Sequence, residues 1–132
     1  KKLQKIYKGE MFEMDLVEIY KALGEITRLR IIMLLLDKKM CGYHIENTLN
    51  VSQSNISRHL TKLKYAKIVK EEKEGQKIYF SINSNFIEKY NLLYESLLGN
   101  RVTHEIFMSD EVKYFENKDE LDLSYSNIAE NI

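Results

Sequence analysis

The chain has 132 residues, of which 44% are hydrophobic, and its 20 basic and 20 acidic residues give a formal net charge of zero. This length fits one compact domain with short appendages and is too short for two ordinary domains. The longest apolar run (residues 31–36) cannot cross a bilayer, so we expect no membrane partner. Because no signal peptide is visible and a lone cysteine excludes an intrachain disulfide, we expect a reducing, cytoplasmic location.

Two apolar helices are expected near the start of a domain that extends over residues 10–99. Residues 1–9 carry four lysines and are expected to form a flexible basic arm, to which we assign no function. From Glu10 to Leu23, apolar residues recur at helical spacing and cover more than one stripe, so this helix needs two packing partners. Glu25 to Asp37 is apolar over most of its surface and is predicted to be the central helix of the core.

The stretch from Cys41 to Leu63 predicts two short helices joined by a tight turn, which is a helix-turn-helix. Asn50 follows the first helix at the position where a left-handed residue is needed. Ser52 is placed to cap the second helix through its hydroxyl group. Within the second helix, Ile56, Leu60 and Leu63 form one apolar stripe that must face the domain.

The opposite face of the second helix has the composition of a DNA-binding surface. Its residues are short or amide-bearing near the start, which suits base edges, and cationic further on, which suits phosphates. An ordinary solvated face would carry Glu–Lys pairs, but residues 51–69 contain no acid, and residues 50–77 carry seven basic residues against three acids. We expect contacts with double-stranded DNA from Ser52, Gln53, Ser54, Asn55, Ser57, Arg58, His59 and Lys62, with His59 serving either as a contact or as a hydrogen-bonded buttress.

A β-hairpin is expected directly after this helix. Ile78, Phe80 and Ile82 alternate with polar residues, and Gly75 supplies the turn. A hairpin in this position is the wing of a winged helix-turn-helix, so the predicted fold is mainly α with a small β-hairpin. Three residues near its tip could contact phosphate or the minor groove, although three neighbouring acids leave a solvated charged turn as an equal alternative; the three are Lys73, Gln76 and Lys77.

The last strong helix, Asn85 to Leu98, has more apolar surface than one chain can bury. We therefore predict a homodimer through the first and last helices, which would present two recognition helices to a palindromic site. The expected interface residues are Met14, Val17, Phe86, Tyr90, Leu93 and Leu97. Residues 100–132 are expected to be an acidic extension, helical to about Phe115 and either disordered or docked beyond Asn117.

Taken together, several short segments resemble the ArsR/SmtB family of bacterial metal- and redox-responsive repressors. They are residues 20–24 (YKALG), 27–31 (TRLRI), 51–54 (VSQS), 57–60 (SRHL), 74–75 (EG) and 78–80 (IYF). The resemblance covers about residues 10–98. It implies a dimeric winged helix-turn-helix repressor that occupies an operator and leaves it when a signal arrives.

The sequence departs from that family at the effector sites. Where arsenic- and cadmium-responsive members have a Cys-x-Cys pair, this chain has Cys41 and then Tyr43. Where zinc-responsive members carry acids and histidines on the last helix, residues 83–98 contain no His, Cys or Asp. We therefore expect no metal and no cofactor, with Cys41 and His44 as weak candidates for a metal or thiol sensor and the inducer left unidentified. His104 lies in the extension without an evident partner.

The sequence thus predicts a DNA-binding repressor and not an enzyme, because it has no glycine-rich phosphate loop and no constellation of histidine, carboxylate and nucleophile. Two alternatives stay open: a winged-helix module that binds protein, and a sensor that uses Cys41 and His44.

Overall fold

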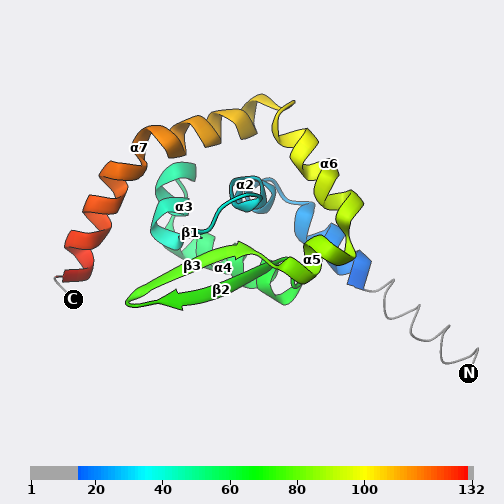
Figure 1. Ribbon diagram of the computed structural model, residues 1–132, viewed down its shortest axis with the longest axis horizontal. Helices are drawn as coiled ribbons and strands as arrows, with labels where there is room; N and C mark the ends of the chain where they lie inside the picture. Colours follow the sequence, from blue (N-terminus) through cyan, green and yellow to red (C-terminus); the bar gives the residue numbers. More distant parts are fainter. Residues whose placement is uncertain (1–14, 131–132) are drawn as a thin grey trace, which may run out of the picture.

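The computed structural model describes residues 15–130, with side chains to residue 123. The expected basic arm (residues 1–9), the start of the first helix and Met14 lie outside these residues. The described part is mainly helical and contains the predicted hairpin, which is part of one three-stranded antiparallel sheet (Figure 1). After a helix over residues 15–23 come α2 (Ile26–Leu35), β1 (Met40–Cys41), α3 (Gly42–Leu49), α4 (Gln53–Tyr65), β2 (Val69–Glu74), β3 (Lys77–Ile82), α5 (Ser84–Lys89), α6 (Asn91–Arg101) and α7 (Glu105–Glu130).

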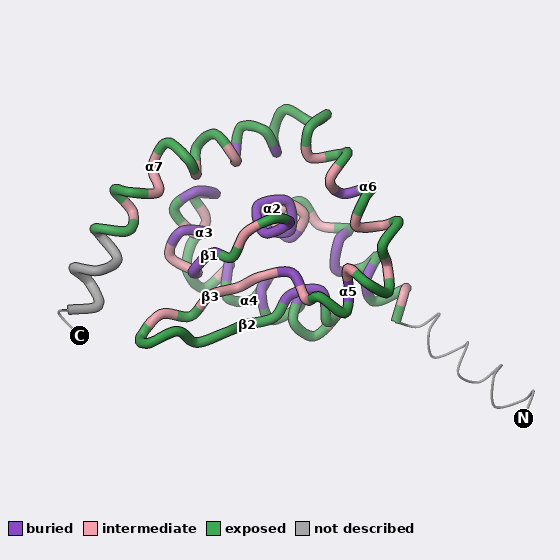
Figure 2. The backbone as a smooth tube through the Cα atoms, in the orientation of Figure 1, coloured by how far each residue is buried: buried purple, intermediate pink, exposed green. Residues whose placement is uncertain are grey.

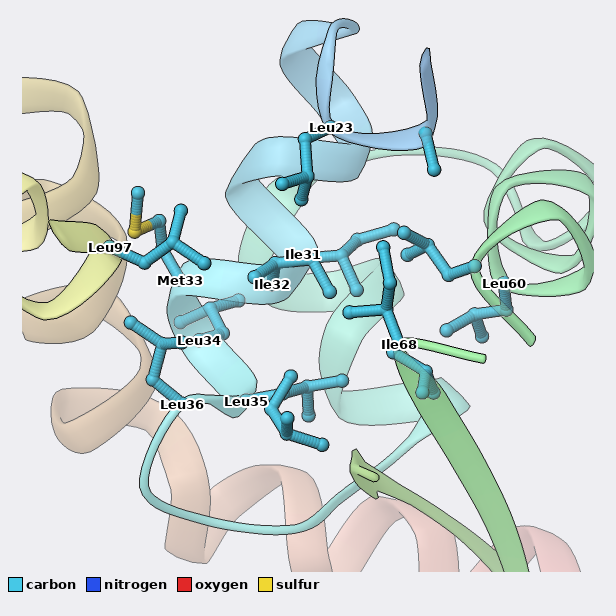
Figure 3. Close-up of a cluster of buried hydrophobic side chains, with 14 of the residues drawn as sticks. Leu23, Ile31, Ile32, Met33, Leu34, Leu35, Leu36, Leu60, Ile68 and Leu97 are labelled. Atoms are coloured by element: carbon cyan, nitrogen blue, oxygen red, sulfur yellow. The ribbon is translucent and has the colours of Figure 1, made fainter. Parts of the chain in front are cut away.

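Helix α2 forms the centre of the core, as its composition predicted. Residues 31–36 are all buried, and Figure 2 shows α2 enclosed by the other elements. In Figure 3 its side chains meet Leu23 of the first helix, Leu60 of α4, Ile68 and Leu97 of α6. A helix that is apolar over most of its surface is stable in such a buried position.

The helix-turn-helix is formed by α3 and α4 and is specified by its local residues. Asn50 ends α3 in the left-handed conformation (φ 55°, ψ 49°). The Ser52 hydroxyl accepts a hydrogen bond from the backbone N–H of Asn55 (3.3 Å). Ile56, Leu60 and Leu63 are buried on the inner side of α4, so the opposite side of the helix faces solvent.

The predicted hairpin is present, and a short third strand adjoins it. β2 and β3 pair from Val69↔Ile82 to Glu74↔Lys77, and Gly75 has a positive φ of 63° at the turn. β1 pairs with the other edge of β3 through Met40↔Phe80 and Cys41↔Tyr79. Two residues are too few to show an alternating pattern, which is why the sequence did not reveal β1. It attaches the hairpin to the start of α3.

The prediction of a single helix from Asn85 to Leu98 is wrong, because the helix is interrupted at Tyr90 (φ −119°, ψ 49°), which separates α5 from α6. Helix α6 is held against the end of α2 by polar contacts that no sequence periodicity encodes. The Tyr94 hydroxyl donates to the carbonyl of Leu36 (2.6 Å), and the Arg101 guanidinium donates to both carboxylate oxygens of Asp37 (2.9 and 3.1 Å).

The acidic extension is a long helix, α7, that arches over α2 and α3 (Figure 1). The expected helix end near Phe115 and the disorder considered beyond Asn117 differ from the structure, in which α7 continues to Glu130 and is docked. Phe107 is buried, and Asp110 is buried in a bidentate ion pair with Arg30. None of the helices within residues 15–130 combines the length and the apolar character needed to span a bilayer.

Candidate nucleic-acid interface

The outer face of α4 displays the polar residues that the sequence singled out. All of them come from one helix and its cap, so their relative positions are fixed by the helix itself. Ser52, Gln53, Ser54, Ser57, Arg58 and Lys62 are exposed, together with Thr61, whereas Asn55 and His59 are half-buried. Between residues 52 and 62 every apolar side chain points inward.

Part of this face is ordered by hydrogen bonds along the helix. The Arg58 guanidinium donates to the side-chain oxygen of Asn55, and the Thr61 hydroxyl donates to the carbonyl of Ser57 (2.9 Å). The side chains of Gln53 and Lys62 make no hydrogen bond or ion pair with another described residue. Their polar ends are therefore available to a partner, Gln53 at the first turn and Lys62 in the third.

The hairpin carries both charges, and its acids are matched by lysines. Lys64 on α4 pairs with Glu71 (2.6 Å), Lys70 pairs with Glu72 (2.8 Å), and Lys39 pairs with Glu74. Such exposed pairs contribute little to stability, but they offset the acidic charge next to α4. Near the tip, Lys73 and Gln76 are exposed and Lys77 is half-buried.

An open groove of about 660 Å³ lies between α3, α4 and the hairpin. On one side it is lined by Gln53, Ser57 and Thr61 of α4, and on the other by Gln76 and Ile78 of the hairpin. The helix and the hairpin therefore border one concave surface. This is the arrangement in which a recognition helix and a wing can contact the same nucleic acid.

Arg28 is the polar residue of this region to which sequence reasoning assigned no role. It is buried, its Nε donates to the carbonyl of Ala22 (2.6 Å) and its Nη2 donates to the carbonyl of Lys21 (3.3 Å), so it caps the end of the first helix. Its Nη1 lies 3.3 Å from Nδ1 of His59 on α4. The only sequence signal for Arg28 was its place in the TRLRI segment.

His59 thus occupies the buttress position that was one of its two predicted roles. Its Nδ1 faces Arg28 and also lies 3.7 Å from the Glu25 carboxylate. Burial lowers the pKa of His59 below its ordinary value of 6.5, although the Glu25 carboxylate opposes this effect.

Cys41 and His44, the weak sensor candidates, are both buried. Burial raises the pKa of the Cys41 thiol and lowers the pKa of His44. His44 packs under α7, with its Nε2 2.9 Å from a carboxylate oxygen of Asp122. The residues that the structure describes contain no cluster of three or more His, Cys, Asp or Glu side chains that could hold a metal. His104, at the start of α7, has a partner after all, since its Nδ1 lies 2.9 Å from the Asn100 carbonyl.

The residues predicted for a dimer interface are placed unequally. Phe86 and Leu97 are buried in the core of the single chain and leave little surface for a second copy. Tyr90 and Leu93 are half-buried, and Val17 is exposed. Three further large apolar side chains on the first helix, α4 and α6 are exposed although they were not among the predicted interface residues, namely Tyr20 (55% exposed), Tyr65 (79%) and Leu92 (86%).

An open hollow of about 400 Å³ lies where the first helix, the end of α4 and α5 meet, and Tyr65 is one of the residues that line it. Ile19, Tyr65, Phe86 and Tyr90 give its walls apolar surface, and charged residues, among them Asp15 and Glu18, also line it. Exposed apolar surface in a hollow is typical of sites that contact another protein chain.

Comparison with known proteins gives consistent matches. A family model described as "Bacterial regulatory protein, arsR family" matches residues 26–71. The transcriptional repressor SdpR of Bacillus subtilis is 34% identical over 70 residues, which cover 53% of this chain and 78% of that protein. The crystal structure of the transcriptional repressor PagR of Bacillus anthracis is similar with a TM-score of 0.55 and 32% identity, covering 64% of this chain and 97% of that chain. The homodimeric winged helix-turn-helix DNA-binding domain Mb0332 of Mycobacterium bovis has a TM-score of 0.59 at 21% identity, covering 74% of this chain and 91% of that chain, and this likeness concerns the fold alone.

Proposed function

The chain belongs to the ArsR family of bacterial transcriptional regulators, and we propose that it represses transcription by binding a palindromic operator as a homodimer. In this proposal α4 is the recognition helix and the β2–β3 hairpin is the wing. Base edges are contacted by Gln53 and Ser54, and phosphates by Arg58, Lys62 and the hairpin tip.

The observation that carries the proposal is the outer face of α4. It is polar at its start and cationic further on, contains no acid, and borders a groove shared with the hairpin. An amide side chain can pair with two groups of an adenine edge, and lysine or arginine can meet phosphate oxygens. This face therefore offers base readout and backbone attraction on one helix.

A protein-binding role for α4 is less well supported. Interfaces between proteins are centred on buried apolar or aromatic side chains, and the outer face of α4 between residues 52 and 62 exposes none. Exposed apolar residues lie on the first helix, at the end of α4 and on α6, as well as on α7. In this proposal the first three elements provide the contact with the second copy that a palindromic operator requires. In the proposed dimer, Val17, Tyr20 and Leu92 contact the partner.

The other parts of the proposal follow from this assignment. The family and fold are those of transcriptional regulators, and we assign no catalysis to the chain. Its place is the cytoplasm, where it would meet operator DNA. The burial of Cys41 argues against a thiol sensor at that residue, because a reactive cysteine is an accessible thiolate.

Selection of binding sites from random DNA tests the proposal directly. Random duplexes of about 30 base pairs, or three helical turns, are selected for binding to the purified protein. The affinity for the most enriched sequence is then compared with the affinity for a shuffled version of it. The expected winner is a palindrome bound by two chains. Gln53→Ala should cost about 1–3 kcal/mol of discrimination at one base pair in each half-site.

A matched control for Gln53→Ala is Glu116→Ala, an exposed substitution on α7 that should leave discrimination unchanged. Recovery of no preferred sequence would refute the operator proposal. Unchanged discrimination in Gln53→Ala, beside a functional wild type, would remove Gln53 from the reading surface and leave the rest intact.

A further inference from the structure

The contact between Arg28 and His59 determines which ring nitrogen of His59 carries its proton. A guanidinium group has only donors, so the Nδ1 atom that lies 3.3 Å from Arg28 Nη1 must be an acceptor. A neutral imidazole that accepts at Nδ1 carries its hydrogen on Nε2. Arg28 therefore selects the tautomer of His59.

Nothing in the described structure uses the Nε2–H group of His59. The Nε2 atom has no hydrogen-bond partner among the described residues. Since it is also not among the buried polar atoms that lack a partner, it is accessible to solvent. The side chain of His59 is 22% exposed and stands next to Arg58 on the cationic half of α4. Its free donor thus lies where the proposed function brings phosphates.

Arg28 itself is firmly held. Two of its guanidinium nitrogens are bound to carbonyl groups at the end of the first helix, and the backbone N–H of Arg28 donates to the Glu25 carboxylate (2.9 Å). The third nitrogen is the one that faces His59. The orientation of the ring is therefore tied to the first helix, which carries part of the proposed dimer surface, as well as to α4.

We propose that Arg28 is a positioning residue for DNA binding: it holds the neutral His59 ring so that Nε2–H donates a hydrogen bond to a phosphate oxygen of the bound duplex. The inference rests on the proposed function and adds to it a contact that does not depend on charge. Three cations are near the ring (Arg28, Arg58 and Lys62) and only Glu25 favours its protonation, and together with burial they lower the pKa of His59 in the free protein.

Two substitutions of His59 separate its two nitrogens. In His59→Asn the side-chain oxygen lies near the former Nδ1 and can still accept from Arg28, but the outward donor is lost. In His59→Gln the amide nitrogen reaches the former Nε2 position and can donate outward, but the acceptor for Arg28 is lost. With the duplex selected by the wild-type protein, we expect His59→Asn to weaken binding about tenfold, as for a hydrogen bond to a charged group, and His59→Gln to stay within about threefold.

Nitrogen NMR of the histidine rings tests the positioning role independently of affinity. In the free wild-type protein the His59 ring should show a protonated Nε2 and an unprotonated Nδ1 near pH 7.5. Arg28→Lys retains a donor and should preserve this tautomer, whereas Arg28→Met should yield a mixture. On addition of the selected duplex, the Nε2–H proton should shift and exchange more slowly with water.

The outcomes distinguish this inference from the proposed function. A wild-type protein that selects no DNA would overturn both. A wild-type protein that binds a selected duplex, together with an equally tight His59→Asn variant or a His59 ring protonated on Nδ1, would overturn the positioning role of Arg28 alone. If Arg28→Met does not fold, the two His59 variants and the wild-type spectrum still decide the question.

Discussion

Replacing Asp110 by Asn should loosen α7 from the rest of the domain. Asp110 is the buried partner of a bidentate ion pair in which Arg30 Nε and Nη2 donate to its two carboxylate oxygens (2.9 and 2.8 Å). The side chain of Asp110 is 7% exposed and that of Arg30 is 22% exposed. The hydrogen bond to Asp110 raises the pKa of Arg30. The guanidinium stays charged even when this partner is neutralised, because arginine remains protonated at neutral pH without such help.

The expected cost is about 2 kcal/mol. Removing one member of a fully buried pair costs about 3–5 kcal/mol, because the other charge is left without a partner. Two features reduce this figure: water reaches part of Arg30, and the Asn oxygen can still accept one hydrogen bond. For a domain of this size, about 2 kcal/mol corresponds to a decrease in melting temperature of roughly 8 °C.

Urea unfolding at fixed protein concentration measures the global effect, and amide hydrogen exchange locates it. A cost of about 2 kcal/mol should speed exchange in α7 about 30-fold if the helix opens separately from the core. Asp119→Asn is the matched control, because it removes the same charge from an exposed position on α7 and should change stability by less than about 0.5 kcal/mol. An Asp110→Asn protein with unchanged stability and unchanged exchange in α7 would refute the reasoning.

Four further expectations concern DNA binding, assembly, the thiol and pH. Lys62→Ala should weaken binding to all sequences alike and lower the slope of log affinity against log salt by about 1 in each chain, whereas Lys113→Ala on α7 should not; a change confined to one sequence would contradict the phosphate assignment. Leu92→Glu should give folded monomers in sedimentation, while Leu123→Glu, also exposed, should stay dimeric. Native Cys41 should react with iodoacetamide far more slowly than after unfolding, and peroxide should leave DNA affinity unchanged, because the thiol is buried and its pKa is raised. Since burial lowers the pKa of His44 below 6.5, the unfolded chain binds a proton first as pH falls; stability should therefore decrease below about pH 6.5, and His44→Gln should flatten this slope.

The helix-turn-helix could be predicted closely because its specifying interactions are local. Asn50 and Ser52 act on backbone groups within five residues of themselves, and the inward stripe of α4 follows directly from the helical period. The same holds for the hairpin, whose turn depends on Gly75 and whose strands pair in the simplest register. A single sequence contains all of this information.

The elements that differed from expectation are held by partners distant in the sequence. The apolar row from Phe86 to Leu97 continues in step across the break at Tyr90, so periodicity could not reveal that α5 and α6 are separate helices. The composition of α7 favoured a partly solvated tail, and its docking depends on Arg30, which is 80 residues away from Asp110. The sequence around a charged residue does not indicate which distant residue of opposite charge it will pair with.

The candidate site shows the same division between local and distant effects. The face of α4 was found because every member lies on one helix, whereas Arg28 was missed because its partners are two carbonyl groups on the first helix and a ring on α4. Arg28 and Arg30 are two positions apart on α2, and successive residues of a helix turn by about 100°, so their side chains leave it in nearly opposite directions. One reaches the first helix and α4, and the other reaches α7. The buried α2 therefore contacts the first helix and the recognition helix through Arg28 and the C-terminal helix through Arg30, so each contact can be tested by a substitution at a separate side chain.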